Sequence, residues 1–231
     1  MNIRIKFYGF SSFTKRDLQS LDQYFSSKAF TADKPQGFLK DEFTSTSWTG
    51  RYIRKNQYSE ELTDPFGKKY IMDRVVFDEI PFRISLEWPH IEIFSQFRLC
   101  ALLLNKLAEA IEFDRSLLPV EFNFQKLFKV IKTNFKSATV TSLLIGEIVV
   151  SPYSVAKFHV EGNEDVRQHI DEILAKKKYK ILSAKMRWTE SEQEIIAKFD
   201  ISGKVEISGP TSKMILPSLR SILRKTNDSI S

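Results

Sequence analysis

The sequence predicts a mixed α+β protein built from two structurally related halves. Several segments alternate apolar and polar residues, which is typical of half-buried β-strands. Other segments repeat apolar residues at every third or fourth position, which is typical of amphipathic helices. The order strand–helix–strands–helix that these patterns predict for the first half returns in the second. We therefore expect one curved antiparallel sheet across both halves, with helices on one face.

The first half, residues 1–113, begins with alternation over residues 2–8, which predicts a strand. Thr14 can cap a following helix, and Asp17 stands three residues on, as in a capping box. Residues 27–41 contain a proline and a glycine and predict a loop.

From residue 43 to residue 94 the pattern is that of strands. Asp64-Pro65-Phe66-Gly67 predicts a turn, and Trp88-Pro89 separates the last two strands. Ser95 is expected to cap an apolar helix that runs through Phe113. The strands are expected near residues 48–53, 69–79, 81–87 and 90–94.

Residues 114–138 are expected to connect the halves through an amphipathic helix over 121–136, with phenylalanines on one face and lysines on another. The second half is residues 139–231. Asn163 should cap a helix whose first turn is acidic and whose last turn, Lys176–Lys178, is basic. Strands are expected at 140–150, 154–160, 179–188, 193–201 and 204–208. A last helix runs to about residue 225, with Pro217 in its first turn or at a kink.

The two halves match most closely at their ends. Phe82–Leu86, a turn and Ile91–Ile93 precede one helix, and Ala197–Ile201, a turn and Val205–Ile207 precede another. In both stretches every second residue is apolar and the residues between are polar. One face of each hairpin should therefore pack on helices, and the other should meet solvent or a partner.

The stretch from Lys198 to Pro210, KFDISGKVEISGP, resembles the end of each repeat in TATA-box-binding proteins. There a strand, a Ser-Gly-Lys turn, a second strand, a glycine and a long helix follow one another. The resemblance implies a duplicated, saddle-shaped fold, with insertions here near residues 27–42 and 54–69. In that family an intercalating phenylalanine stands two positions before the serine of the turn, where this chain has Asp200. A carboxylate cannot intercalate, so this departure from the family pattern predicts contact with the phosphate backbone without wedges between the bases.

The composition narrows the classes of protein that the chain can represent. Its 231 residues carry a net charge of +6 and one cysteine, Cys100, which excludes a disulfide framework. The N-terminus alternates instead of forming an apolar signal sequence, and the apolar runs are shorter than a membrane span needs. A reducing cytoplasm and no membrane partner are the expectation.

The residues that usually carry chemistry do not form a catalytic pattern. His90, His159 and His169 are scattered, and none has neighbours at metal-ligand spacing. Cys100 stands among leucine and alanine, which favours a buried and unreactive thiol. No glycine-rich phosphate loop is present. The sequence therefore predicts a protein that is not an enzyme and has no metal or small-molecule cofactor.

Two basic features are candidates for contact with nucleic acid, whose phosphates attract lysine and arginine on one surface. One is the outward face of the predicted sheet. The other is the lysine stripe of residues 121–136, extended by Lys176–Lys180. The favoured function is non-enzymatic binding of DNA or RNA by the sheet face. The alternative is a protein-interaction subunit of a multi-protein complex, one that could process nucleic acid or act in defence. The candidate residues are Arg51, Arg54, Arg83, Lys185, Arg187 and Lys198.

Overall fold

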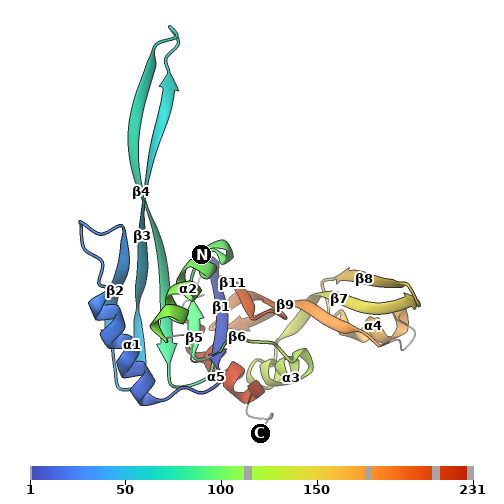
Figure 1. Cartoon of the computed structure of the whole chain (residues 1–231). Coiled ribbons are helices and arrows are strands. Elements are labelled where there is room, and N and C mark those ends of the chain that lie inside the picture. The colour runs from blue at the N-terminus through green and yellow to red at the C-terminus, as the bar shows by residue number, and fades with distance from the viewer. Residues whose placement is uncertain (1, 112–115, 175–177, 210–213, 228–231) are drawn as a thin grey trace. The chain divides into compact units, whose positions relative to one another are not determined.

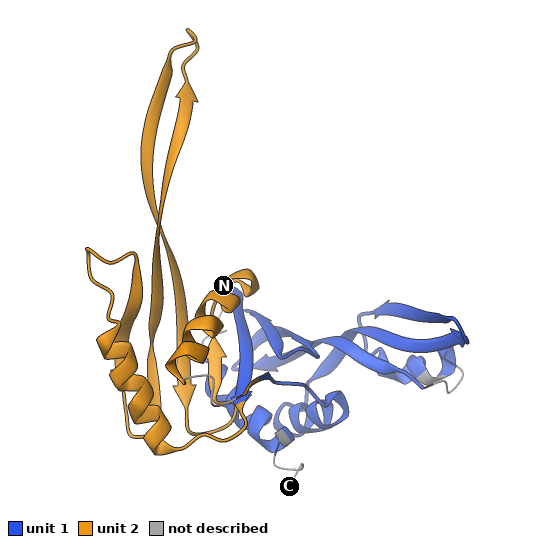
Figure 2. Cartoon of the chain, in the orientation of Figure 1, with its two compact units in different colours: residues 1–9, 118–231 blue, residues 10–117 orange. Residues whose placement is uncertain are grey.

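A computed structural model describes residues 2–111, 116–174, 178–209 and 214–227. It confirms the α+β class: antiparallel, unclosed sheet and five α-helices occupy the described residues (Figure 1). The chain divides into two compact units, shown in Figure 2. Unit 1 comprises residues 1–9 and 118–231, and unit 2 comprises residues 10–117. None of the described helices is long and apolar enough to cross a membrane.

Unit 1 contains an antiparallel sheet in the order β1-β11-β10-β9-β7-β8. The strands agree closely with the alternation in the sequence. Pro217 lies in the first turn of the last helix, where its missing N–H costs no hydrogen bond. The elements are β1 (Asn2–Phe10), β6 (Leu117–Pro119), α3 (Phe124–Asn134), β7 (Thr139–Ser151), β8 (Ser154–Glu161), α4 (Arg167–Ile173), β9 (Lys180–Glu190), β10 (Gln193–Asp200), β11 (Lys204–Ser208) and α5 (Leu216–Asn227).

The helices of unit 1 lie on one side of its sheet (Figure 1). Ile131 of α3 and Leu219 of α5 face the buried side chains of Trp188, Ala197 and Phe199 on β9 and β10. Ile170 of α4 lies on the same side of the sheet. The helices therefore bury the apolar face that the alternation predicts, and the polar side chains of these strands point to the other face.

Unit 2 packs helices against a second antiparallel set of strands in the order β2-β3-β4-β5. Thr14 and Asp17 form the predicted capping box at the start of its first helix. The elements are α1 (Lys15–Ser27), β2 (Gln36–Phe43), β3 (Ser47–Thr63), β4 (Lys69–Ser85), β5 (Ile91–Ile93), the 3-10 helix η1 (Phe97–Leu99) and α2 (Cys100–Ala110).

An aromatic cluster forms the core of unit 2. The indole of Trp48 is fully buried, stacks on Phe82 at 4.8 Å between ring centroids and lies 4.7 Å from the ring of Phe25. Its Nε1–H donates a 3.2 Å hydrogen bond to Asp22 of α1. These three rings pack α1 against the sheet and bury large apolar surface between them.

Beyond β2, strands β3 and β4 continue as a two-stranded arm (residues 56–76, Figure 1). Asp64 and Gly67 close its tip in the predicted turn: the Asp64 carboxylate accepts from the N–H groups of Phe66 and Lys68, both at 2.9 Å. Large apolar side chains are exposed on both faces of the arm. They are Tyr58, Leu62, Tyr70, Ile71, Met72 and Val75, with Phe66 at the tip.

Several predicted boundaries in unit 2 are wrong. The expected loop over 27–41 contains most of β2, because Gly37 lets this strand approach the backbone of Phe30. The expected break between residues 79 and 81 is absent. Pro81 lies within β4, and its carbonyl accepts a hydrogen bond from Phe94 N–H, just past the end of β5. The nitrogen of Pro81 faces the same side as its carbonyl, beyond the last residue of β5. Its missing N–H therefore removes no hydrogen bond between β4 and β5.

Two predicted helix caps are also wrong. The N–H of Phe94 donates to the Pro81 carbonyl, Ser95 lies in a bend, and η1 begins only at Phe97 without a side-chain cap. Gly162 and Val166 are hydrogen-bonded to β7, which delays α4 to Arg167 and leaves Asn163 outside it. Helix α3 is shorter than expected and is capped by Asn123. The predicted helix end at Phe113 and the lysines 176 and 177 lie outside the described residues.

His90 makes the stability of unit 2 sensitive to acid. Its Nδ1 accepts a 3.1 Å hydrogen bond from Phe10 N–H. The centre of its ring lies 6.0 Å from that of Phe10 and 5.7 Å from that of Phe13. Burial lowers the pKa of His90 below its ordinary value of 6.5, since the protonated ring would lose solvation. The neutral ring is thus the form that the folded state prefers.

We expect the thermal midpoint of unfolding to fall as the pH drops below about 6.5, because the unfolded chain then binds the proton more readily than the folded chain. Melting the protein at pH 7.5 and 5.5 measures this, and His90→Gln should flatten the dependence in that range. The carboxylates Asp78 and Asp165, whose pKa values are lowered, act nearer pH 4. An equal pH dependence in the variant would contradict the assignment.

Candidate nucleic-acid interface

The polar face of the unit 1 sheet arises from strict alternation along β9 and β10. Ala184, Met186 and Trp188 are buried on the helix side, whereas Lys185 and Arg187 point to the opposite face. On β10, Lys198 lies between the buried residues Ala197 and Phe199. The structure therefore brings three of the predicted residues, Lys185, Arg187 and Lys198, onto one face of one unit.

Strand register arranges the charges of this face in transverse rows. The central row contains Lys198, which is paired with Lys185 of β9 and with Glu206 of β11. The neighbouring row contains Lys204, which is paired with Lys6 and with Asp200. From β1 to β8 the central row is Arg4, Glu206, Lys198, Lys185, Ser142 and Glu161.

Two pairs of lysines stand directly opposite each other on this face, Lys185 with Lys198 and Lys6 with Lys204. Like charges in direct cross-strand pairs destabilise a sheet. Lys185 has a carboxylate partner, Glu161, at 3.4 Å. Lys198 has none within 4.0 Å among the described residues. The centre of the face thus carries positive charge that the folded chain does not neutralise.

Two adjoining hollows follow this face. The larger, about 530 Å³, includes Lys185, Lys198 and Glu206, and the smaller, about 400 Å³, includes Lys185 and Arg187. Arg187 is held by a 2.9 Å hydrogen bond from its Nη2 to the carbonyl of Asn163 and by an ion pair with Glu194 at 3.7 Å. Positive side chains therefore border both hollows.

Asp200 occupies the position where the resemblance places a wedge. Its Oδ1 accepts hydrogen bonds from the backbone N–H and the hydroxyl of Ser202. Gly203 follows with φ of 80° and donates its N–H to the Asp200 carbonyl. The carboxylate thus shapes the Ser-Gly-Lys turn, which explains why an acidic residue is accommodated there.

The other three predicted residues lie in unit 2, and each is ion-paired. Arg51 contacts Asp41 and Glu79, both at 3.3 Å, and Arg54 contacts Asp78 at 2.7 Å. Arg83 contacts Glu92, which is nearly fully buried, at 3.2 Å. The hydrogen bonds from Arg54 hold the pKa of Asp78 below its ordinary value. These guanidinium groups are neutralised within unit 2.

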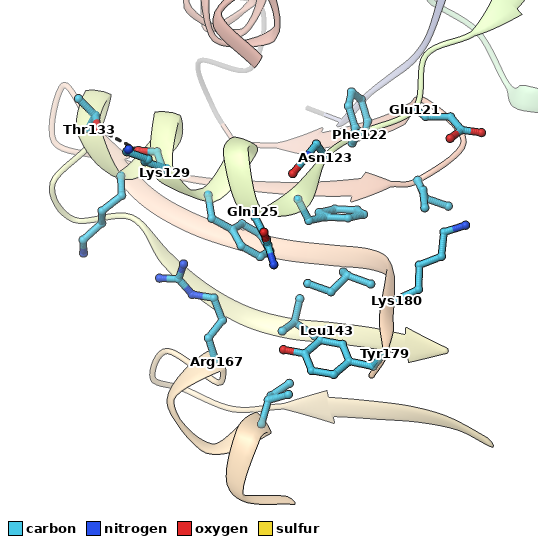
Figure 3. Close-up of a pocket in the computed structure, with 16 residues that line it drawn as sticks. Glu121, Phe122, Asn123, Gln125, Lys129, Thr133, Leu143, Arg167, Tyr179 and Lys180 are labelled. Atoms are coloured by element: carbon cyan, nitrogen blue, oxygen red, sulfur yellow. Dashed lines mark hydrogen bonds between the residues drawn. The ribbon is translucent and has the colours of Figure 1, made fainter. Parts of the chain in front are cut away.

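A groove of about 980 Å³ lies on the helix side of unit 1, between α3, α4 and the start of β9 (Figure 3). Lys129, Lys132 and Lys180 of the predicted lysine stripe line it. Arg167 also lines it, although sequence reasoning did not select this residue. The sequence predicted a helix starting at Asn163, whereas α4 begins at Arg167, and no local pattern marked this residue.

Other candidate chemistry is not assembled in the described residues. They contain no group of three or more histidine, cysteine or acidic side chains that could hold a metal ion. His159 donates to or accepts from the Ser142 hydroxyl at 2.8 Å, beside the larger hollow. Cys100 is buried, as expected for a thiol that packs as a small apolar group.

Comparison with known proteins adds no assignment. No protein-family model matches the chain. No curated protein matches its sequence either.

Proposed function

We propose that the chain is a non-enzymatic nucleic-acid-binding protein, which contacts the phosphate backbone of DNA or RNA with the polar sheet face of unit 1. The observation that carries the proposal is the pair Lys185 and Lys198, directly opposed on neighbouring strands beside a hollow. A phosphate between two such ammonium groups relieves their repulsion and gains two charge-assisted contacts.

The carboxylates of the same face set the character of this binding. Glu161, Asp200 and Glu206 alternate with the basic residues, so the face is a mosaic with an excess of positive charge. Such a face favours moderate affinity that depends strongly on salt. Asp200 also favours backbone contact over insertion between bases, since a carboxylate repels phosphates and cannot stack.

We further propose that the fold is a duplicated one. The two matched hairpins, residues 82–93 and 197–207, support a duplicated, saddle-like architecture similar to that of TATA-box-binding proteins. The single buried cysteine supports a reducing, cytoplasmic setting.

The test is a binding titration with labelled single-stranded DNA, double-stranded DNA and RNA at about 50 mM and 200 mM salt. We expect binding that weakens steeply with salt. Lys185→Glu with Arg187→Glu should weaken affinity at least about tenfold at low salt. It should also reduce the slope of log K against log salt concentration by the amount that corresponds to about two lost phosphate contacts.

The matched control is Lys15→Glu with Arg16→Glu, which changes the net charge equally at two exposed residues of α1. It should retain the affinity of the unaltered chain to within about twofold, since neither residue belongs to the sheet of unit 1. An absence of binding at 50 mM salt, or an equal loss in both double variants, would overturn the proposal.

A second candidate function, a protein-interaction subunit, is favoured by the arm of unit 2. Its side chains, with Phe66 95% exposed and Ile71 77% exposed, form apolar surface of the kind that anchors protein partners. Purification with a stoichiometric protein partner and without nucleic acid would favour this function over the first.

A further inference from the structure

The groove on the helix side of unit 1 combines an apolar floor with a basic rim. It lies on the face of the sheet opposite to Lys185, because its floor includes Leu143 and Ile181, whereas Ser142 and Lys185 face the other side. Its volume, about 980 Å³, is within the range of sites for small organic ligands. It is therefore a concavity distinct from the proposed nucleic-acid face.

The floor of the groove is built from rings and branched aliphatic side chains. Phe122, Phe124 and Phe128 come from α3 and the segment before it, and Phe124 and Phe128 lie 5.8 Å apart. Tyr179 projects from the start of β9 toward the same space (Figure 3). The three phenylalanines are nearly fully buried and supply apolar floor, whereas Tyr179 is 37% exposed and offers a ring on which a nucleobase can stack.

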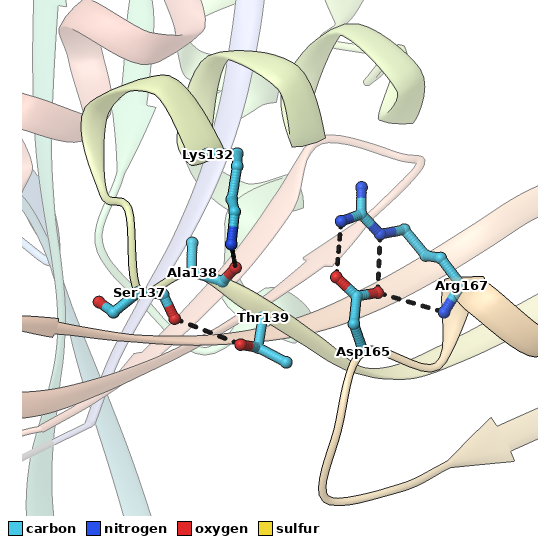
Figure 4. Close-up of polar contacts among 6 residues, drawn as sticks. All are labelled: Lys132, Ser137, Ala138, Thr139, Asp165 and Arg167. Carbon is cyan, nitrogen blue, oxygen red and sulfur yellow. Dashed lines mark hydrogen bonds and ion pairs between the residues drawn. The ribbon is translucent and has the colours of Figure 1, made fainter.

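Two lysines of α3 lie along one side of the groove. Lys129 and Lys132 stand one turn apart on α3, and both are exposed. The Nζ of Lys132 donates to the carbonyl of Ala138 at 3.1 Å, which leaves two of its three N–H donors (Figure 4). Neither lysine has a carboxylate within 4.0 Å among the described residues.

Arg167 is fixed in place by its own neighbour. Its Nε and Nη2 donate to the two oxygens of Asp165 at 2.8 and 2.6 Å (Figure 4). Its guanidinium lies 5.1 Å from the centre of the Phe128 ring. The hydrogen bonds to Asp165 raise the pKa of Arg167, so this side chain is charged at any physiological pH. Asp165 balances its charge, and the N–H groups of Nη1 are not donated to Asp165.

The acidic residue of the lining, Glu121, lies at the end of the groove away from Lys129 and Arg167 (Figure 3). Lys180 is near that end and is ion-paired with Glu147 at 3.5 Å. The groove is thus polarised, with positive charge at one end and apolar surface in the middle. A ligand that complements it has an anionic end and a flat apolar body.

We propose that this groove binds a nucleoside phosphate, with the phosphates between Lys129, Lys132 and Arg167 and the base over the apolar floor beside Tyr179. The site is independent of the nucleic-acid contact assigned to the other face of the sheet. The exposed ring of Tyr179 favours a nucleobase over an alkyl chain. The two lysines without carboxylate partners in the described part of the chain, together with the guanidinium N–H groups that Arg167 does not donate to Asp165, favour a phosphate at the other end.

Isothermal titration with ADP tests this site, with pyrophosphate, adenosine and decyl phosphate as separate probes. ADP should bind with a Kd below about 1 mM. Pyrophosphate and adenosine should each bind at least about tenfold more weakly, since each lacks one half of the complementary ligand. An absence of ADP binding at millimolar concentration overturns the proposal, and tighter binding of decyl phosphate than of ADP overturns the nucleobase assignment.

Variants locate the binding. Lys129→Glu with Lys132→Glu should weaken ADP at least about tenfold, whereas the exposed pair Lys15→Glu with Arg16→Glu should not. Tyr179→Ala should weaken ADP but leave pyrophosphate unchanged, because it removes a ring and no charge. Circular dichroism confirms that each variant is folded. Full ADP affinity in the lysine variant would place the ligand elsewhere and refute the site, whatever the sheet face binds.

Discussion

Trp48→Ala should lower the free energy of unfolding of unit 2 by about 3–5 kcal/mol, the range for removal of a large buried aromatic side chain. The indole is fully buried and contacts the rings of Phe25 and Phe82. Alanine leaves a cavity between α1 and the sheet and removes the hydrogen bond to Asp22. Urea titration followed by circular dichroism measures the loss without relying on tryptophan fluorescence.

The control for this change is Phe66→Ala at the tip of the arm. It also truncates an aromatic side chain, but the ring is 95% exposed, so the stability should change by less than about 0.5 kcal/mol. Equal effects of the two substitutions would show that the aromatic cluster does not hold unit 2 together.

Gly203→Ala should destabilise unit 1 by about 3 kcal/mol through two separate causes. Gly203 has φ of 80°, a conformation that side chains disfavour. A Cβ there would also lie 2.5 Å from the carbonyl oxygen of Val120 and 3.0 Å from that of Phe7. Both atoms are backbone, and Phe7 is hydrogen-bonded to Gly203 and Val120, so the strand β1 must shift.

Gly67→Ala separates the two causes. Gly67 has a similar φ of 84°, but nothing lies within 4 Å of a Cβ added there. It should therefore cost only the conformational penalty, about 1 kcal/mol. Thermal unfolding of both variants gives the difference. If the two glycines prove equally replaceable, the close approach of β1 to the Ser-Gly-Lys turn is not what requires glycine.

The strands of unit 1 were predictable from sequence because each has one buried and one polar face. Alternation along β9 and β10 identifies Lys185, Arg187 and Lys198 as outward residues, and the structure agrees. The capping box at Thr14 was predictable as well, because it depends on residues only three positions apart. Local patterns of this kind do not require knowledge of distant contacts.

The turn at the tip of the arm and its second strand were predicted, but the extension of β3 past Ile53 was not, because this part of the strand lacks a buried face. The residues from Gln57 to Thr63 do not alternate between polar and apolar side chains. Only the structure shows that they pair with Lys69–Val75. The opposed pair Lys185 and Lys198 likewise depends on which strands are neighbours. The groove at Arg167 depends on the packing of α4 against the sheet. Sequence patterns along one strand carry no information on such cross-strand relations.

The two strands of the arm pair only with each other among the described residues, which has a consequence for solubility. Bare strand edges with exposed apolar side chains are templates for cross-β assembly. Asp73 and Arg74 interrupt the run from Tyr70 to Phe77, and the Asp73 carboxylate accepts a 2.7 Å hydrogen bond from the Ser59 hydroxyl across the ribbon. These two residues act as gatekeepers, since stacking of one arm on another would bury a charged side chain on each face of the strand at a cost in desolvation.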